Sequence, residues 1–319
     1  MKTITVAHVS DLHLPFEPKL GLAQRLSKRQ LSAWAWRRRR SIHREEILAV
    51  LATELREADA DHIAVTGDVT NFALPQEFAR AASWLQALAP ADRISVVPGN
   101  HDALVPVDEV EGLRRWSAWT GADGVWPFVH HCQGLALIGL SSALPTAPLL
   151  ARGRIGAQQL VRLEAMLDEE GRAGRVRVVL VHHPVADGAV SWRRALADRV
   201  QLRAVLRRAG AELVLHGHAH HARLDALPGP EGTRGMIPCL CVPSSSALAN
   251  SKDEAARWHR LRFRPSGRVE VSVRQWSAAQ ARFIDAGCYE LCLPRRVTGA
   301  SSVAAPIHRS STELAHTAA

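Results

Sequence analysis

Aspartate, histidine and asparagine side chains recur in five short motifs, and these residue types bind metal ions in proteins. A mixed set of carboxylate, amide and imidazole ligands suits Mn, Fe, Zn or Co better than Mg or Ca, which prefer oxygen ligands throughout. The sequence therefore predicts a transition-metal site built from separate parts of the chain. The motifs are DLH (Asp11, His13), GD (Asp68), GNHD (Asn100, His101, Asp102), HHP (His182, His183) and GHAH (His218, His220).

The spacing within two of these motifs explains how their side chains can meet. In an extended segment residues i and i+2 point the same way, so Asp11 and His13 can converge on one site. The same spacing separates His218 from His220. Glycine permits sharp turns and close approach of the backbone, and the glycines expected to serve the site in this way are Gly67, Gly99 and Gly217.

The elements that must position these motifs are short apolar runs rich in β-branched residues. Such runs indicate strands covered on both faces, and they are Ile4–Val9, His62–Thr66, Ile94–Val97, Leu135–Leu140, Val176–Val181 and Glu212–Leu215. All but the fourth lead into a motif, and binding groups converge at the carboxyl ends of strands in open α/β sheets. Between several runs lie segments with helical periodicity: Ile47, Leu48, Leu51 and Leu55; Phe78, Ala82, Leu85 and Leu88; and Leu160, Leu163 and Leu167. This alternation predicts a layered α/β domain.

The last third of the chain has a different pattern. Met236–Val242, Trp258–Phe263 and Val269–Gln275 follow one another without a helix, and the PSG sequence at 265–267 indicates a turn between the last two. We expect these segments to form a second, more antiparallel sheet. We expect one domain over residues 1–275, with a C-terminal extension over 276–319 that is disordered from about residue 297, where Ser, Thr and Ala dominate.

Composition limits the class of protein. The 319 residues carry a net charge of +9, which favours anionic partners such as phosphate esters, nucleic acid or an acidic membrane surface. The apolar start of the chain is broken by polar residues and is not expected to be a signal peptide, and Cys132–Ala151 is expected to be a buried strand and a loop. The five cysteines are expected to be free thiols in a reducing cytoplasm, and the spacing of Cys288 and Cys292 is weak evidence for a metal.

The series DLH, GD, GNHD, HHP and GHAH resembles the calcineurin-like metallophosphoesterase superfamily over about residues 1–275. The resemblance implies a four-layer αββα sandwich in which two divalent transition metals, with Mn as the first expectation, activate a hydroxide that attacks phosphorus. It assigns one metal to Asp11, His13, Asp68 and His220, and the other to Asp68, Asn100, His182 and His218.

The resemblance also assigns roles outside the metal ligands. His182 is preferred over His183 because the family pattern is His-x-Pro, and His101 would donate to the phosphate or the leaving oxygen. Asp102 would orient His101. We expect His216 to lie at a strand end behind the ligands and His221 to be exposed.

A basic insertion over residues 14–45 separates the first two motifs. From residue 19 to residue 44 it has nine Lys or Arg residues and no acidic residue. Such a segment can dip into an anionic membrane interface, it can be a solvated helix whose apolar side chains pack on the core, or it can bind a nucleic-acid backbone, which we regard as the weakest of the three. The interleaved apolar residues are Leu20, Leu22, Leu26, Leu31, Trp34 and Trp36.

Two subgroups of the superfamily compete as the best match. LSKRQLSAWAWRRRR followed by VTGDVTNFALPQEF resembles the lipid A-pathway pyrophosphatases of the chlamydial type, which cleave UDP-2,3-diacylglucosamine and would act at the inner face of the membrane. Class III cyclic-nucleotide phosphodiesterases share every metal motif and are the alternative. GDVTNFA and GNHD differ from the GDxVDRG and GNHE of protein phosphatases. A non-catalytic scaffold of the same fold is disfavoured because every expected ligand is present, and the oligomeric state is not indicated.

Overall fold

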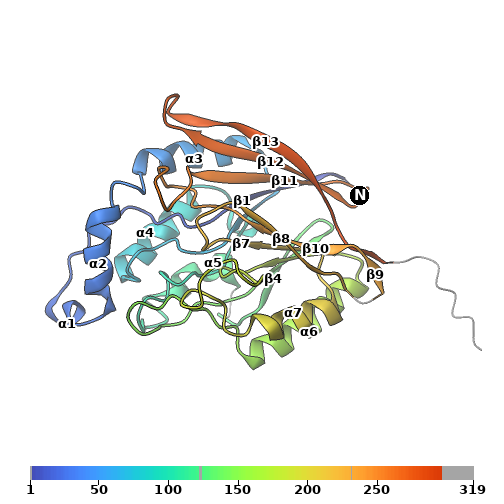
Figure 1. The fold of residues 1–319 in the computed structure, drawn as a ribbon, viewed down its shortest axis with the longest axis horizontal. Helices are drawn as coiled ribbons and strands as arrows, with labels where there is room; N and C mark the ends of the chain where they lie inside the picture. Colours follow the sequence, from blue (N-terminus) through green and yellow to red (C-terminus); the bar gives the residue numbers. More distant parts are fainter. Residues whose placement is uncertain (1, 122–123, 231, 297–319) are drawn as a thin grey trace, which may run out of the picture.

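The computed structural model describes residues 2–121, 124–230 and 232–296. The expectation of disorder from about residue 297 falls outside this part of the chain. Two six-stranded sheets and a set of helices make up the structure (Figure 1).

The first sheet has the strand order β13-β12-β11-β1-β2-β3. Its parallel half comes from the start of the chain and is made of β1 (Ile4–Val9), β2 (His62–Val65) and β3 (Ile94–Val96). Its antiparallel half comes from the end and is made of β11 (Arg257–Phe263), β12 (Arg268–Ser277) and β13 (Arg282–Cys292). The two halves meet where β11 pairs with β1, with His8 opposite His259.

The second sheet has the order β4-β5-β6-β7-β10-β8. The four central strands are parallel: β5 (Leu135–Gly139), β6 (Val176–Leu180), β7 (Leu213–His216) and β10 (Met236–Cys241). The edges are antiparallel and consist of β4 (Phe128–Cys132) and β8 (Arg223–Pro228). A separate short pair joins β9 (Thr233–Arg234) to β14 (Arg295–Arg296).

The expected grouping of the late strands is therefore wrong. β10 joins the second sheet beside β7, whereas β11 and β12 extend the first sheet. The physical reason is the unpaired edge of β1: its backbone groups need partners, and β11 supplies them from the far end of the chain. β13 continues the same sheet to Cys292, beyond the expected domain end at residue 275.

The helices form the two outer layers, as the expected αββα sandwich requires. α3 (Glu45–Glu57) and α4 (Pro75–Gln86) pack on the first sheet, and α6 (Ala157–Arg172) and α7 (Arg199–Ala209) pack on the second, on the opposite side of the molecule (Figure 1). The shorter helices are α1 (Leu22–Arg25), α2 (Lys28–Arg39), α5 (Ser117–Thr120) and the 3-10 turns η1 (Ala91–Arg93) and η2 (Leu113–Trp116).

Three buried apolar clusters fill the spaces between the four layers. In β5, Leu135 and Leu137 face the cluster between the sheets, whereas Ala136 and Ile138 face the cluster under α6 and α7. This alternation follows from the two-residue period of a strand. The predicted helical face over Ile47–Leu55 is confirmed. Ile47, Leu48, Leu51 and Leu55 are all buried on α3.

The basic insertion forms α1 and α2 at one end of the molecule (Figure 1). Its apolar side chains divide into two groups. Trp36 is buried against Phe72 and Leu74, while Leu22, Leu26, Leu31 and Trp34 are 82%, 94%, 48% and 56% exposed. Packing against the core thus explains only some of the apolar side chains in the insertion.

The structure bears on the expectations for the apolar segment Cys132–Ala151 and for the cysteines. The segment from Cys132 to Ala151 contains β5 and a loop, and within the described residues no helix combines the length and apolarity needed to cross a membrane. All five cysteines are free thiols, with Cys288 and Cys292 exposed.

Candidate metal centre

The motif residues lie in loops just after the strands, and many of them adopt a left-handed backbone. β1 ends at Val9 and β7 ends at His216, so the motif pairs that follow these strands are not extended as expected. The φ angles are +50° for Asp11, +42° for His13, +52° for Asp68, +68° for His218 and +61° for His220. Left-handed non-glycine residues cost about 1–3 kcal/mol each and cluster at functional sites. The side chains converge because the chain turns sharply at each strand end.

The three glycines singled out in the sequence lie where the backbone approaches these side chains most closely. A Cβ atom at Gly67 would lie 2.6 Å from Nδ1 of His182. A Cβ at Gly99 would overlap the Asp68 carboxylate, and one at Gly217 would overlap Asp11. No other residue type fits these positions without moving a ligand candidate.

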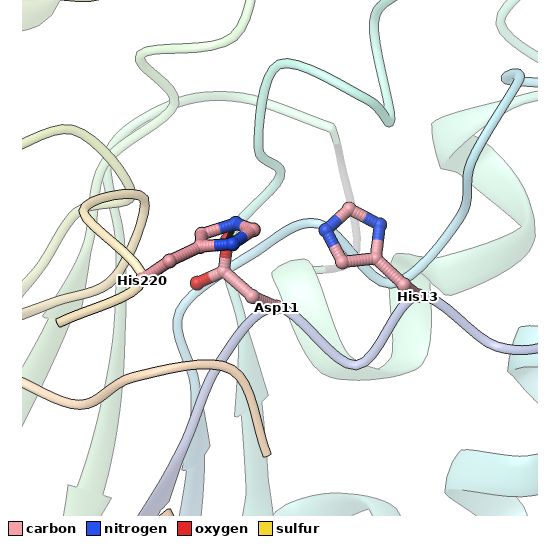
Figure 2. Close-up of side chains that lie close together, drawn as sticks. All are labelled: Asp11, His13 and His220. Carbon is pink, nitrogen blue, oxygen red and sulfur yellow. Dashed lines mark ion pairs between the residues drawn. The ribbon is translucent and has the colours of Figure 1, made fainter. Parts of the chain in front are cut away.

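Asp11, His13 and His220 form one group, which we call the Asp11 position. Nε2 of His220 lies 3.2 Å from Oδ1 of Asp11, and the backbone N–H of His218 donates to Oδ2 of Asp11 at 3.0 Å. Figure 2 shows the three side chains on two separate segments, with His220 beside Asp11. Nε2 of His13 is buried without a hydrogen-bond partner, and the buried Oδ1 of Asp11 has only its ion pair with His220. A bound cation would satisfy both atoms, so these residues fit a metal.

Asp68, His182 and His218 form a second group, the Asp68 position, with Asn100 beside it. Nε2 of His182 lies 3.4 Å from Oδ2 of Asp68, 3.3 Å from Oδ1 of Asn100 and 3.2 Å from Nδ1 of His218. The same Oδ2 lies 3.9 Å from Nε2 of His13. Asp68 therefore lies between the two positions, where a bridging ligand would be.

Hydrogen bonds on the outer side of three imidazoles determine which nitrogen faces inward. Nδ1 of His182 donates to the Thr66 carbonyl at 2.7 Å, and Nε2 of His218 donates to the Arg194 carbonyl at 3.0 Å. Nδ1 of His220 lies 2.5 Å from the Asp253 carboxylate. In each case the opposite nitrogen faces the cluster, where it could offer its lone pair to a metal ion once deprotonated.

The electrostatics of the cluster favour positive charge at its centre. Burial opposes the charged form of His182, but the Asp68 carboxylate outweighs it and raises the pKa of His182 to about 9. Burial is likewise outweighed at His220, where Asp11 and Asp253 raise the pKa to about 9. The same contacts lower the pKa of Asp11 and Asp68 despite burial. Without a metal ion, protons on the two histidines neutralise the carboxylates; divalent cations would replace them.

His101 and Asp102 are near the centre, but their relationship differs from the expected one. Nδ1 of His101 bonds to the Asn71 carbonyl at 2.9 Å, not to Asp102. The Asp102 carboxylate instead accepts from the backbone N–H groups of Gly99 and Thr70, each at 2.8 Å. Asp102 therefore fixes the loops that carry the ligands, because a buried carboxylate satisfies several backbone donors at once.

The other histidines of the motifs lie outside the two positions. His183 bonds to Ser142 at 2.7 Å and to the Ala151 carbonyl at 3.2 Å, so His182 is the one that joins the cluster. His216 ends β7 and is fully buried, and His221 is exposed beside Glu254. His216 and His221 lie where the sequence predicted, and His183 lies outside the two groups.

Sequence reasoning missed several residues around the centre. His43, from the insertion, has its ring centroid 4.4 Å from that of His13, and Asp253 contacts His220. Arg194 donates from its guanidinium to the His218 carbonyl. None of these three residues lies in a motif. The sequence pointed only to His43, and only because the insertion that carries it lies between two ligand motifs.

A cavity of about 480 Å³ opens over the centre. Its floor includes ligand candidates from both positions and His101. Its walls add two cationic side chains, Arg194 and Lys252, next to small apolar residues. The remaining lining residues are Ala151, Ala189, Val190, Ala219, His221 and Asp253.

A two-sheet αββα sandwich whose strand ends carry an Asp/His/Asn cluster beneath an open cavity is the architecture of a binuclear metal-dependent phosphoester hydrolase. A family model described as calcineurin-like phosphoesterase matches residues 4–222, and the chain belongs to this family. The protein is thus an enzyme that hydrolyses phosphoesters with divalent metal ions. A comparison with curated proteins gives no match.

Solved structures share the fold at low sequence identity. A dimetal phosphatase from Danio rerio superposes with a TM-score of 0.58 at 14% identity, covering 88% of this chain and 98% of the other. Purple acid phosphatase PPD1 from yellow lupin gives a TM-score of 0.55 at 12% identity, covering 91% of this chain and 53% of the lupin chain. Similarity at this level establishes the fold and leaves the substrate to the features of this chain.

Proposed function

We propose that the protein hydrolyses the pyrophosphate or phosphodiester bond of a nucleotide-linked lipid, with UDP-2,3-diacylglucosamine or a similar molecule as the leading substrate. The reaction would take place at the inner face of a membrane. The proposal refines the phosphoesterase class through three features of this chain: the ligand geometry, the cations of the cavity and the basic insertion.

In the proposed centre, the side chains already described would hold two cations. One would be bound by Asp11, His13, Asp68 and His220, and the other by Asp68, Asn100, His182 and His218. Mixed nitrogen and oxygen ligands favour Mn, Fe, Zn or Co, with Mn as the first candidate. When bound, such ions would neutralise phosphate oxygens and make a water molecule acidic enough to supply the attacking hydroxide.

His101 is the proposed acid for the leaving group. It lines the cavity, and its Nδ1 is held by the Asn71 carbonyl, so Nε2 is the ring atom that would meet the substrate. As an imidazolium, the ring would donate this proton to the departing oxygen. Asp102 keeps the loop of His101 in place through its backbone contacts.

The observation that carries the lipid proposal is that the insertion extends from the metal centre to an exposed apolar surface. Its inner end brings His43 against His13 at the metal centre. Its outer end exposes Leu22, Leu26 and Trp34 among basic residues. A substrate with a phosphate group at the metals and apolar chains beyond would contact both ends. Exposed leucine and tryptophan side chains next to Lys and Arg suit an anionic membrane surface.

A groove of about 370 Å³ within the insertion supports the same proposal. Its lining contains the apolar side chains of Leu20, Trp34 and Trp36. It also contains two positive charges, from Arg25 and Arg37, against one negative charge, from Glu17. Amphipathic lining of this kind suits a molecule with both an acyl chain and an anionic group.

The cavity over the metal centre supports a substrate with a second anionic group. Arg194 and Lys252 lie on its walls, outside the ligand groups. A phosphate held at the metal positions would leave these cations for a neighbouring phosphate, as a pyrophosphate provides.

The test is Mn²⁺-supported hydrolysis of three substrates in parallel: an acylated UDP-sugar in mixed micelles, 3',5'-cyclic AMP and bis-p-nitrophenyl phosphate. We expect the acylated UDP-sugar to be preferred. A preference for the cyclic nucleotide would contradict the lipid proposal and favour a cyclic-nucleotide phosphodiesterase. Hydrolysis of none of the three would leave the phosphoesterase class intact and overturn the substrate assignment.

A surface variant separates the insertion from the catalytic centre. The triple change Leu22→Ser, Leu26→Ser and Trp34→Ser should slow hydrolysis of the micellar substrate and leave bis-p-nitrophenyl phosphate unaffected. The matched control is Val161→Ser with Val200→Ser, which removes apolar side chains that are 69% and 58% exposed on α6 and α7. Equal effects of the two variants would contradict a role for the insertion.

A further inference from the structure

The imidazoles at the two metal positions are held by different kinds of partner. At the Asp68 position, His182 and His218 donate to backbone carbonyls. Because these partners are backbone groups, a substitution at Thr66 or Arg194 would not remove them. At the Asp11 position, His220 is held by the side chain of Asp253, and the ring of His13 lies against the side chain of His43.

Asp253 is itself fixed before it meets His220. The side-chain amide of Asn250 donates to Oδ2 of Asp253 at 2.8 Å, which leaves Oδ1 facing Nδ1 of His220 at 2.5 Å. The backbone N–H of Glu254 donates to the His220 carbonyl at 3.3 Å, so both chain segments are joined twice. His220 therefore contacts a carboxylate on each side, that of Asp253 through Nδ1 and that of Asp11 through Nε2. A carboxylate behind a ligating imidazole fixes its tautomer and raises the basicity of the inner nitrogen.

His43 lies on the other side of the same position. Its ring packs between His13, with centroids 4.4 Å apart, and Trp36, whose ring is nearly parallel at 6.3 Å. Its Nδ1 bonds to Ser246 Oγ at 2.9 Å. The backbone around it is also anchored, because the N–H of Arg44 donates to the Ser246 carbonyl at 3.1 Å. A buried ring held from two sides limits where the ring of His13 can go.

We propose that His43 and Asp253 are positioning residues for the Asp11 position, so that removing either empties this position before the Asp68 position. The inference rests on the proposed metal assignment. Asp253 acts by orienting His220, and loss of such an outer carboxylate typically weakens metal binding about 10–100-fold. His43 acts by confining the ring of His13 and connects the basic insertion to the metal centre.

The experiment titrates metal-stripped full-length protein with Mn²⁺ alone. Bound metal per chain is measured by mass spectrometry, and the electron paramagnetic resonance spectrum distinguishes a spin-coupled Mn pair from a single Mn ion. The variants are Asp253→Ala and His43→Ala, with Glu254→Ala as the matched control, because Glu254 neighbours Asp253 and pairs with His221 and Arg257. His43→Phe tests the packing role, since phenylalanine keeps a ring against His13 but cannot bond to Ser246.

The wild type and Glu254→Ala should bind two Mn²⁺ and show the pair spectrum. Asp253→Ala and His43→Ala should keep one tight Mn²⁺, bind the second about 10–100-fold more weakly and show the single-ion spectrum. His43→Phe should recover the pair. Two tight ions in both alanine variants, or equal loss of both ions, would overturn the inference. Failure of the wild type to bind Mn²⁺ would instead count against the metal assignment in the proposed function.

Should the alanine variants fail to fold, Asp253→Asn replaces them. It keeps the size of the side chain and removes the charge that makes the inner nitrogen more basic. We expect weaker binding of the second Mn²⁺ in this variant with an unchanged circular dichroism spectrum. Wild-type affinity for both ions would contradict the role of Asp253.

Discussion

Oδ2 of Asp68 lies 3.4 Å from Nε2 of His182, and both side chains are almost completely buried. The same oxygen faces Nε2 of His13 from the other metal position at 3.9 Å. Burying a carboxylate at this point is costly unless positive charge surrounds it. The position of Asp68 between the two groups therefore makes it the residue on which both metals would depend.

Asp68→Ala should remove both metals and abolish hydrolysis. The variant loses the oxygen that both groups share, and the backbone N–H of His101 loses its acceptor at 2.7 Å. Metal content by mass spectrometry and the rate with bis-p-nitrophenyl phosphate check this result. Retention of metal and rate by Asp68→Ala would show that the ligand assignment is wrong.

His101→Ala should reduce the rate without reducing the metal content. His101 lines the cavity within reach of His13 and Asp68, but the Asp11 and Asp68 positions each have three other candidate ligands. A positioned acid is worth about 10²–10⁴-fold in rate. The loss should be large for a poor leaving group, such as the alkoxide from a cyclic nucleotide, and small for p-nitrophenolate, which needs no proton. An equal loss with both leaving groups would contradict an acid role.

Asp102→Ala should destabilise the protein more than it alters the chemistry of His101. Removing the carboxylate leaves the buried N–H groups of Gly99 and Thr70 without their acceptor. Unsatisfied buried donors cost about 1–3 kcal/mol each, so the free energy of unfolding should fall by roughly 2–6 kcal/mol. Urea denaturation measures this change, and the pH dependence of kcat provides the contrast. A shifted pH profile at unchanged stability would instead mean that Asp102 acts on His101 directly.

The sequence predicted that these candidate ligands would lie close together, because the information is local. Each ligand candidate directly follows a buried apolar run, as Asp11 follows β1 and Asp68 follows β2, and parallel strands bring such points to one edge of a sheet. The periodicity of Leu51 and Leu55 likewise predicted the buried face of α3 without reference to the rest of the chain.

The residues that were missed depend on contacts between distant segments. His43 reaches His13 because the backbone beside it pairs with the segment at Ser246 and Ala247, and no local pattern reports such a pairing. The pairing of β11 with β1 is equally distant, so the late strands were assigned to the wrong sheet. The left-handed backbone at His218 was missed for another reason: it is strained, and local propensity favours the relaxed alternative.

The metal-free protein should be most stable near pH 6.5 and lose stability on either side. Because the folded-state pKa of His182 and of His220 is raised from 6.5 to about 9, each binds its proton more tightly in the folded chain. Their contribution is complete below pH 6.5 and is lost as the pH rises through about 9. Other fully or largely buried histidines have a lowered pKa. As the pH falls below 6.5 these residues bind protons in the unfolded chain but not in the folded one, so stability falls; they are His8, His13, His62, His183, His216, His218 and His259. Melting temperatures from pH 5 to 9.5, with chelator and with Mn²⁺, measure the loss of stability above and below pH 6.5. The alkaline fall should vanish with Mn²⁺, because the cations take the place of the protons on His182 and His220, and its persistence in the metal-loaded protein would contradict their role as ligands.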